Sequence, residues 1–203
     1  MYGVCALDTF ALGLLRHRYN YLRFISVINI RVGWVDKLMG SKRAGSGRVE
    51  VGEIAPDFTL PSQSGEKVSL KDFVGKTAVV LYFYPKDETP GCTKEACAFR
   101  ADHEQFRKLQ AEVIGVSSDP VESHQQFAEK YNLPFILLSD EGGEVRKLYG
   151  VPSTLLGLLP GRVTYVIDKE GVVRQVFSSH LNVVRHVEEA LKTLSSIASE
   201  PRT

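Results

Sequence analysis

The chain has 203 residues, a net charge of +1 and three cysteines. This length suits one domain with an appendage, and a core of that size folds without disulfides or metals. So few cysteines, in an odd number, exclude a secreted disulfide framework. We therefore expect a reducing compartment, in which a pair of cysteines is redox-active or metal-binding rather than structural.

The first 48 residues differ in charge from the rest. They carry eight basic and two acidic side chains, a net charge of +6, which leaves −5 for the remainder. The glycine- and serine-rich stretch from Gly40 to Arg48 is typical of a linker. We expect residues 1–48 to be a basic, poorly ordered extension, residues 49–198 the folded domain, and residues 199–203 a tail. The domain shows no basic stripe that would indicate nucleic-acid binding.

Several roles for the extension remain open on the residues alone. Its apolar runs are too short for a membrane span, which needs about 20 residues. An arginine-rich, acid-poor composition fits an organelle transit segment, but serine is sparse. The segment could also touch an anionic membrane surface, or simply lie upstream of the domain without a role. Cys5 lies here, and nothing in its context activates it.

Apolar runs between turn residues predict the elements of the domain. The run Ala78–Tyr84 is β-branched and aromatic and ends at Pro85, which indicates a buried central strand. After it we expect a helix from about Cys92, with Ala96, Phe99, Phe106 and Leu109 on its buried side, and then a strand over Glu112–Ser118. A helix capped by Asp119, with Pro120 at its first position, should lead to a strand over Pro134–Asp140 and a short helix from Gly143 to Gly150. The domain should end with a hairpin of Arg162–Asp168 and Val172–Ser178 and a closing helix over His186–Ile197.

This order of elements predicts the fold class. Strands and helices alternate first, and a hairpin and a helix follow, which favours an α/β domain with a mixed central sheet flanked by helices on both faces. A central strand that leads into a helix beginning with a cysteine resembles the thioredoxin fold. The chain contains no Gly-rich phosphate loop and no nucleotide-binding fingerprint.

The other two cysteines lie in the stretch YFYPKDETPGCTKEACAF, five positions apart. Cys92 falls at the expected helix start, where free N–H groups and the helix dipole lower a thiol's pKa and raise the fraction of reactive thiolate. Thr89 lies three residues upstream, close enough for its hydroxyl to reach the thiolate or a substrate oxygen. Pro90 and Gly91 constrain the turn between them.

The spacing of Cys92 and Cys97 limits what the pair can do. If both are helical, their Cα atoms are about 8–9 Å apart. A disulfide needs at most about 7 Å. The pair therefore cannot close within a regular helix. Either it never closes, or the chain alternates between a helical dithiol and a locally unwound disulfide.

Two alternatives remain at this point. The cysteines could be inert, buried side chains, an interpretation that has more weight for Cys97 than for Cys92. They could also bind zinc together with His180 and His186, although so loose a spacing gives this hypothesis little support. The C-x-x-C motif of thioredoxin-like disulfide oxidoreductases is absent.

The segment PKDETPGCTKEAC contains P-x-x-x-T-x-x-C and resembles the active-site signature of peroxiredoxins. The second cysteine, five positions later, is similar to the Q subfamily, also called bacterioferritin comigratory proteins. The similarity runs from about Val51 to Ser195 and includes GEIAPDFTLP, LPFILLSDE, YGVP and GRVTYVIDKEGVV.

The resemblance implies a role for each site residue. Cys92 would be the peroxidatic cysteine, whose thiolate attacks a peroxide and becomes a sulfenic acid. Thr89 would orient the peroxide, and Arg162 would stabilise the thiolate and the developing charge. Pro85 would shield the site from water. Cys97 would resolve the sulfenic acid as an intramolecular disulfide, which thioredoxin or a similar dithiol protein would reduce.

We therefore expect a thiol-dependent peroxidase that reduces hydrogen peroxide and organic hydroperoxides without a metal, haem or flavin. The resemblance also implies a monomer. It implies a bacterial cytoplasm, and the similarity of the domain to photosynthetic members favours a cyanobacterial source. The alternative is a plastid, with residues 1–48 as a transit segment. The alternative function is a peroxide sensor or redox relay, in which Cys92 passes oxidation to a partner protein that docks on the basic extension.

Overall fold

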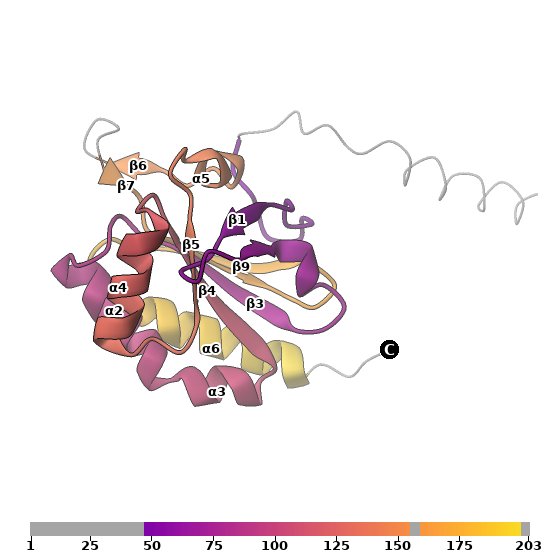
Figure 1. Ribbon diagram of the computed structural model, residues 1–203. Helices are drawn as coiled ribbons and strands as arrows, with labels where there is room; N and C mark the ends of the chain where they lie inside the picture. The colour runs from indigo at the N-terminus through magenta and orange to yellow at the C-terminus, as the bar shows by residue number, and fades with distance from the viewer. Residues whose placement is uncertain (1–46, 155–158, 200–203) are drawn as a thin grey trace, which may run out of the picture. The chain divides into compact units, whose positions relative to one another are not determined.

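The structure is a computed structural model that describes residues 47–154 and 159–199. Cys5 and nearly all of the expected extension lie outside the described residues, as do residues 200–203, so the domain limits stay a prediction. Figure 1 shows the elements. In chain order they are β1 (Thr59–Pro61), β2 (Lys67–Ser69), η1 (Leu70–Asp72), β3 (Ala78–Phe83), α2 (Pro90–Ala101), α3 (His103–Lys108), β4 (Ala111–Ser117), α4 (Val121–Tyr131), β5 (Ile136–Ser139), α5 (Glu144–Leu148), β6 (Ser153–Thr154), β7 (Leu159–Pro160), β8 (Val163–Ile167), β9 (Val173–Ser178) and α6 (Val183–Ser199).

The central sheet contains both the alternating strands and the later hairpin that the element order predicts. Among the described residues it has five strands in the order β5-β4-β3-β8-β9. β3 pairs in parallel with β4 and antiparallel with β8, while β4–β5 is parallel and β8–β9 antiparallel. The mixed sheet and the α/β class are therefore confirmed, and β3 is the strand at which the parallel and antiparallel halves meet.

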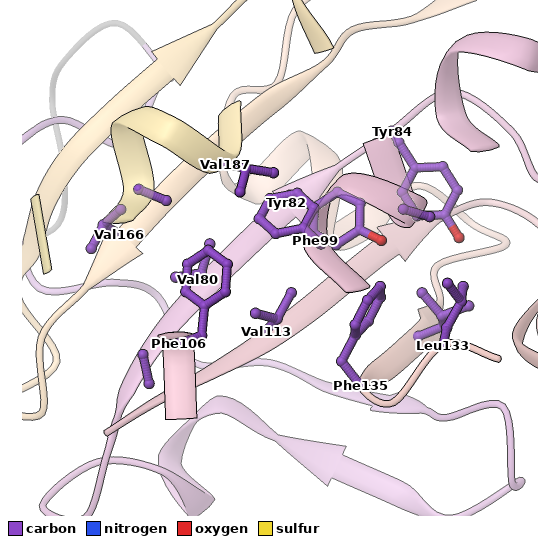
Figure 2. Close-up of a cluster of buried hydrophobic side chains, with 14 of the residues drawn as sticks. Val80, Tyr82, Tyr84, Phe99, Phe106, Val113, Leu133, Phe135, Val166 and Val187 are labelled. Carbon is purple, nitrogen blue, oxygen red and sulfur yellow. The ribbon is translucent and has the colours of Figure 1, made fainter. Parts of the chain in front are cut away.

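β3 is buried along its whole length, so both faces of the sheet pack against apolar side chains. Its even-numbered residues point to one face, where α2, α3, α4 and α6 contribute residues such as Phe99 and Val187 (Figure 2). Its odd-numbered residues point to the other face, where η1 contributes Leu70 and α5 contributes Val145. The period of two along the strand is what places helices on both faces.

The helix that begins near Cys92 is in fact two helices. Asp102 separates α2 from α3. Its N–H donates to the Ala98 carbonyl, which closes α2, and its own carbonyl accepts from Phe106, which opens α3. Phe99 and Phe106 nevertheless pack in the same cluster, with ring centroids 5.7 Å apart. The buried side predicted from the sequence is therefore kept across the break.

The predicted cap of α4 is wrong by one position. Pro120 is the N-cap residue, since the N–H of Ser123 donates to its carbonyl. Asp119 is buried instead, and its carboxylate accepts from the Ser117 hydroxyl and from the N–H of Asp87. An aspartate after a strand predicts a cap for the next helix. The local sequence does not show that the N–H of Asp87 donates to the Asp119 carboxylate instead.

The limits of α5 and α6 also differ from the prediction. α6 spans Val183–Ser199 rather than His186–Ile197, and α5 spans Glu144–Leu148 rather than Gly143–Gly150. In the part of the chain that the structure describes, no helix is both long and apolar enough to cross a membrane.

Candidate active site

Cys92 lies in the first turn of α2, directly after the loop that leaves β3. Thr89 is the N-cap residue, and Pro90 occupies the first helical position, where its missing N–H costs nothing. The Cys92 side chain is 2% exposed. Because N–H groups at a helix start have no acceptor within the helix, this position favours a negatively charged sulfur.

Arg162 meets Cys92 from the entrance to β8. Its Nη2 lies 3.3 Å from Cys92 Sγ, and both side chains are buried. Gly161, which precedes Arg162, has no room for a side chain, because a Cβ at that position would come within 2.1 Å of the Pro152 carbonyl oxygen. A guanidinium charge therefore faces the thiol in a buried setting, where electrostatic interactions are stronger than at the surface.

The same guanidinium contacts Glu95, one helical turn beyond Cys92. Arg162 Nη1 donates to Glu95 Oε2. Glu95 is fully buried, and burial raises its pKa to about 8 although Arg162 acts in the opposite direction. Burial alone would lower the pKa of Arg162, but Glu95 and Cys92 raise it, so the arginine stays charged.

His186, from α6, completes this group. Its Nδ1 lies 2.7 Å from Thr164 Oγ1, and its Nε2 lies 2.9 Å from the Ser179 carbonyl oxygen. The same Nδ1 is 3.7 Å from Glu95 Oε1. Burial lowers the pKa of His186 to about 4, with a further contribution from the Arg162 charge. We call the group the thiol cluster; its members are Cys92, Glu95, Arg162, Thr164 and His186.

Thr89 and Pro85 lie in the segment that leads into Cys92. Thr89 Oγ1 donates to the Lys86 carbonyl oxygen at 3.0 Å. Its hydrogen is therefore engaged, and only its lone pairs remain for a ligand. Pro85 is half-buried in the loop between β3 and α2.

Cys97 lies in the same uninterrupted helix as Cys92. It is half-buried, and both cysteines are free. Regular helix geometry puts their Cα atoms about 8–9 Å apart, which is beyond the limit of about 7 Å for a disulfide. The structure is therefore the helical dithiol, and the unwound disulfide stays a prediction.

A second buried polar group holds the loop before α2. Asp87 accepts from the hydroxyls of Tyr84 and Ser123 at 2.7 and 2.8 Å, and lies 2.9 Å from His124 Nδ1. His124 Nε2 lies 3.2 Å from the Leu138 carbonyl oxygen. Burial alone would raise the pKa of Asp87, but the bond and charge of His124 lower it. We call this group the anchor network; its members are Tyr84, Asp87, Asp119, Ser123 and His124.

The zinc hypothesis gains no support from the described residues. No group of three or more histidine, cysteine or carboxylate side chains among them could hold a metal ion. His186 directs its two ring nitrogens at Thr164 and Ser179, while His180 is exposed.

Sequence reasoning missed Glu95 and Asp87, and it considered His186 only as a metal ligand. One signal was available, because Glu95 follows Cys92 by three positions and so lies on the same side of α2. The partners of Glu95 come from distant parts of the chain, and no local pattern indicates them.

Comparisons with known proteins agree with this geometry. A model described as the AhpC/TSA family matches residues 51–176, a span that includes all five predicted site residues. "Peroxiredoxin Q, chloroplastic" of Triticum aestivum is 56% identical over 151 residues, which cover 74% of this chain and 69% of that protein. The resemblance inferred from the motifs is confirmed.

Solved structures show the same fold. Peroxidoxin BcpB from Mycobacterium tuberculosis matches with a TM-score of 0.69 and 41% identity, covering 74% of this chain and 99% of that one. The Xanthomonas campestris bacterioferritin comigratory protein, solved in work on its alkyl peroxide reduction activity, matches with a TM-score of 0.67 and 31% identity, covering 74% and 98%. The thioredoxin-like fold predicted from the sequence is therefore confirmed.

Proposed function

Because this chain belongs to the AhpC/TSA family and is a peroxidase of the peroxiredoxin Q type, we propose that it reduces hydrogen peroxide and organic hydroperoxides through a sulfenic acid on Cys92. The observation that carries the proposal is the 3.3 Å contact between Arg162 Nη2 and Cys92 Sγ at the start of α2. A cation contacts a sulfur that lies at the start of a helix, and both features favour its thiolate. The activity named for the Xanthomonas campestris relative supports including organic hydroperoxides.

In the first step the Cys92 thiolate attacks one peroxide oxygen, and the O–O bond breaks. Cys92 becomes a sulfenic acid, and the leaving hydroxide or alkoxide takes up a proton to give water or an alcohol. Arg162 offsets the negative charge as it moves from the sulfur to the leaving oxygen. Thr89, whose hydrogen is engaged by Lys86, would accept a hydrogen bond from the peroxide O–H and so orient the attacked oxygen. Pro85 would limit the entry of water.

In the second step Cys97 attacks the sulfenic sulfur of Cys92, which forms the disulfide and releases water. α2 must unwind for this step, because the helix keeps the two residues too far apart. The anchor network holds Asp87 on one side. On the other side Phe99 stacks on Tyr82, with ring centroids 4.6 Å apart (Figure 2). We expect the unwound segment to lie between Asp87 and Phe99.

The remaining parts of the proposal concern the reductant, the assembly and the compartment. A thiol reductant must reopen the disulfide, and we propose thioredoxin for this role and a monomer as the working unit. The Triticum aestivum relative is named chloroplastic. That name favours a plastid, with residues 1–48 as a transit segment, and leaves the expected bacterial cytoplasm without support.

Hydrogen peroxide consumption with thioredoxin, its reductase and NADPH tests the two steps. We expect the wild type to turn over continuously and Cys92→Ser to be inactive. Cys97→Ser should reduce about one equivalent and then stop as a sulfenic acid, which a dimedone adduct on Cys92 would report. Cys5→Ser is the matched control and should behave as the wild type.

Two other results would contradict the proposal. Equal consumption by the wild type, Cys92→Ser and Cys97→Ser would remove the peroxidatic role from this pair. A wild type that consumes one equivalent and cannot be recycled by thioredoxin would favour the relay, in which a partner protein receives the oxidation.

A further inference from the structure

Glu95 has a carboxylate oxygen that lacks a hydrogen-bond partner in the part of the chain that the structure describes. Oε2 accepts from Arg162, whereas Oε1 is buried and unpaired. The whole side chain is 0% exposed. An ionised carboxylate buried with one oxygen unpaired is costly, because that oxygen has exchanged water for no other donor.

The group that faces this oxygen is the imidazole of His186. Its Nδ1 lies 3.7 Å from Glu95 Oε1. Its Nε2 faces the Ser179 carbonyl oxygen at 2.9 Å, and because a carbonyl only accepts, Nε2 carries the ring proton. In the neutral ring Nδ1 is then bare, and the Thr164 hydroxyl donates to it at 2.7 Å. Glu95 Oε1 therefore faces a nitrogen that has no proton to give.

We propose that Glu95 is a neutral carboxylic acid when Cys92 is a thiolate, with its proton on Oε1, so that Arg162 keeps its full charge for the sulfur. Arg162 Nη1 then donates to the carbonyl oxygen of the acid, and Nη2 donates to the thiolate. Glu95 and His186 are positioning residues, since they act through Arg162. The inference rests on the proposed peroxidatic role of Cys92.

The charges around the cluster favour this arrangement. Arg162 is the cation between two acidic groups, Cys92 and Glu95, and ionising both would bury a net negative charge. Tyr82, on the neighbouring strand, is fully buried, and burial raises its pKa well above the usual range, so it stays neutral. His180, in the exposed loop before α6, contributes only the last of the effects that lower the pKa of His186.

The pKa directions agree with the geometry. Burial raises the pKa of Glu95 to about 8 against the pull of Arg162. Burial lowers the pKa of His186 to about 4, and the Arg162 charge adds to the effect. Glu95 and His186 can share one exchangeable proton in two ways: a carboxylic acid beside a neutral imidazole, or a carboxylate beside an imidazolium. Both pKa shifts favour the first arrangement.

Infrared spectroscopy of the reduced full-length protein at pH 7 tests where the proton lies. A carboxylic acid has a carbonyl-stretch band that is separate from the bands of a carboxylate. We expect the wild type minus Glu95→Gln difference spectrum to contain this band and to shift in D₂O. Glu189→Gln, on α6, is the matched control and should remove only carboxylate bands. A Glu95→Gln difference that contains only carboxylate bands would overturn the inference.

Nitrogen-15 NMR of the wild type provides a second test if Glu95→Gln does not fold. We expect His186, assigned with His186→Gln, to show a neutral ring with its proton on Nε2 at pH 7. An imidazolium signal at that pH would overturn the inference, since His186 would then be able to donate to an ionised Glu95.

The consequence for the sulfur is measured as thiolate absorbance against pH. If Glu95 is neutral, Glu95→Gln should leave the midpoint of Cys92 ionisation within about 0.3 pH units of the wild type. If Glu95 is ionised, its removal takes away a negative charge near the thiolate and lowers the midpoint by about one unit or more, which contradicts the inference. None of these readouts uses peroxide turnover, so a failure here and a failure of the proposed peroxidase are distinguishable.

Discussion

Two buried polar groups lie on either side of the first turn of α2, and they are built in opposite ways. In the anchor network, both oxygens of Asp87 are engaged, by Tyr84 on one side and by Ser123 and His124 on the other. In the thiol cluster, Glu95 Oε1 and Arg162 Nε lack a hydrogen-bond partner within the residues that the structure describes.

The difference separates a structural role from a chemical one. A fully bonded network is rigid, because every rearrangement would leave a buried group unpaired. A cluster with unpaired polar atoms can accept new charge, as the proposed mechanism requires when the sulfur ionises and a peroxide oxygen departs. The anchor network therefore holds the loop before Cys92, while the thiol cluster surrounds the Cys92 sulfur.

The largest expected effect comes from breaking the anchor network. Asp87→Asn removes the anion that pairs with buried His124, and breaking such a pair costs about 3–5 kcal/mol of the free energy of unfolding. Urea denaturation measures it, with the exposed Asp57→Asn as the matched control. Glu95→Gln should cost less than about 1 kcal/mol, because a neutral acid is replaced by a neutral amide. Equal losses for Asp87→Asn and Glu95→Gln would erase the distinction between the two groups.

Removing the cation of the thiol cluster should affect the chemistry more than the fold. Arg162→Gln keeps a polar side chain but loses the charge beside Cys92. We expect the rate of Cys92 oxidation, followed by stopped-flow fluorescence, to fall on the order of 100-fold. Arg174→Gln, which changes an exposed arginine paired with Asp168, should leave that rate as it is. An unchanged rate in Arg162→Gln would mean that helix N–H groups alone activate the sulfur.

The proton on Glu95 predicts how stability depends on pH. The folded-state pKa of Glu95 is about 8 against 4.5 as a reference, and that of His186 is about 4 against 6.5. Between pH 4.5 and 6.5 the folded and unfolded chains each hold one proton on this pair, so the two contributions cancel. Above pH 6.5 only the folded chain keeps its proton, so stability is lost as pH rises towards 8.

This loss amounts to at most about 1.4 kcal/mol per pH unit. It is measured as the free energy of unfolding of the wild type minus that of Glu95→Gln, from urea titrations across this range. The difference should decline as the pH rises. A difference that stays constant, or that grows with pH, would show that the folded chain holds no extra proton at Glu95.

The smallest expected effect concerns the unwinding of α2. Gly91 has helical backbone, and a Cβ there would meet Arg162 Nη2 at an ordinary contact distance of 3.4 Å. Gly91→Ala should stabilise the helical state by about 0.4–1 kcal/mol, which slows disulfide closure by roughly 2–5-fold. Gly142→Ala, in a loop remote from α2 in sequence, is the matched control for the general gain in stability. If both variants close at the wild-type rate, helix unwinding does not limit closure.

Much of the fold could be predicted because its signals are local. β3 is a continuous apolar run, β4 is largely apolar, and the turn between β8 and β9 is marked by DKEG. Cys92 could be placed at a helix start from the Thr-Pro-Gly that precedes it. The break at Asp102 and the cap at Pro120 were not predicted, since each depends on hydrogen bonds that compete with an equally plausible local pattern.

The site was less predictable because its partners are far apart in the chain. Arg162 entered only through the family resemblance; its own sequence context is that of a solvated residue at a strand edge. Glu95 is charged and helical, which locally indicates an exposed side chain, yet it is fully buried against Arg162. No spacing rule relates Glu95 to His186 in α6, and only the packing of α6 on α2 brings them together.

Placing both cysteines on one helix makes peroxide tolerance a property of that helix. In the proposed mechanism, the Cys92 sulfenic acid has two competing fates: closure with Cys97, or attack on a second peroxide, which yields a sulfinic acid that thiols do not reduce. The first rate is set by how readily α2 unwinds and the second by peroxide concentration. Their ratio defines a dose above which the enzyme inactivates itself, and each increment of helix stability lowers that dose.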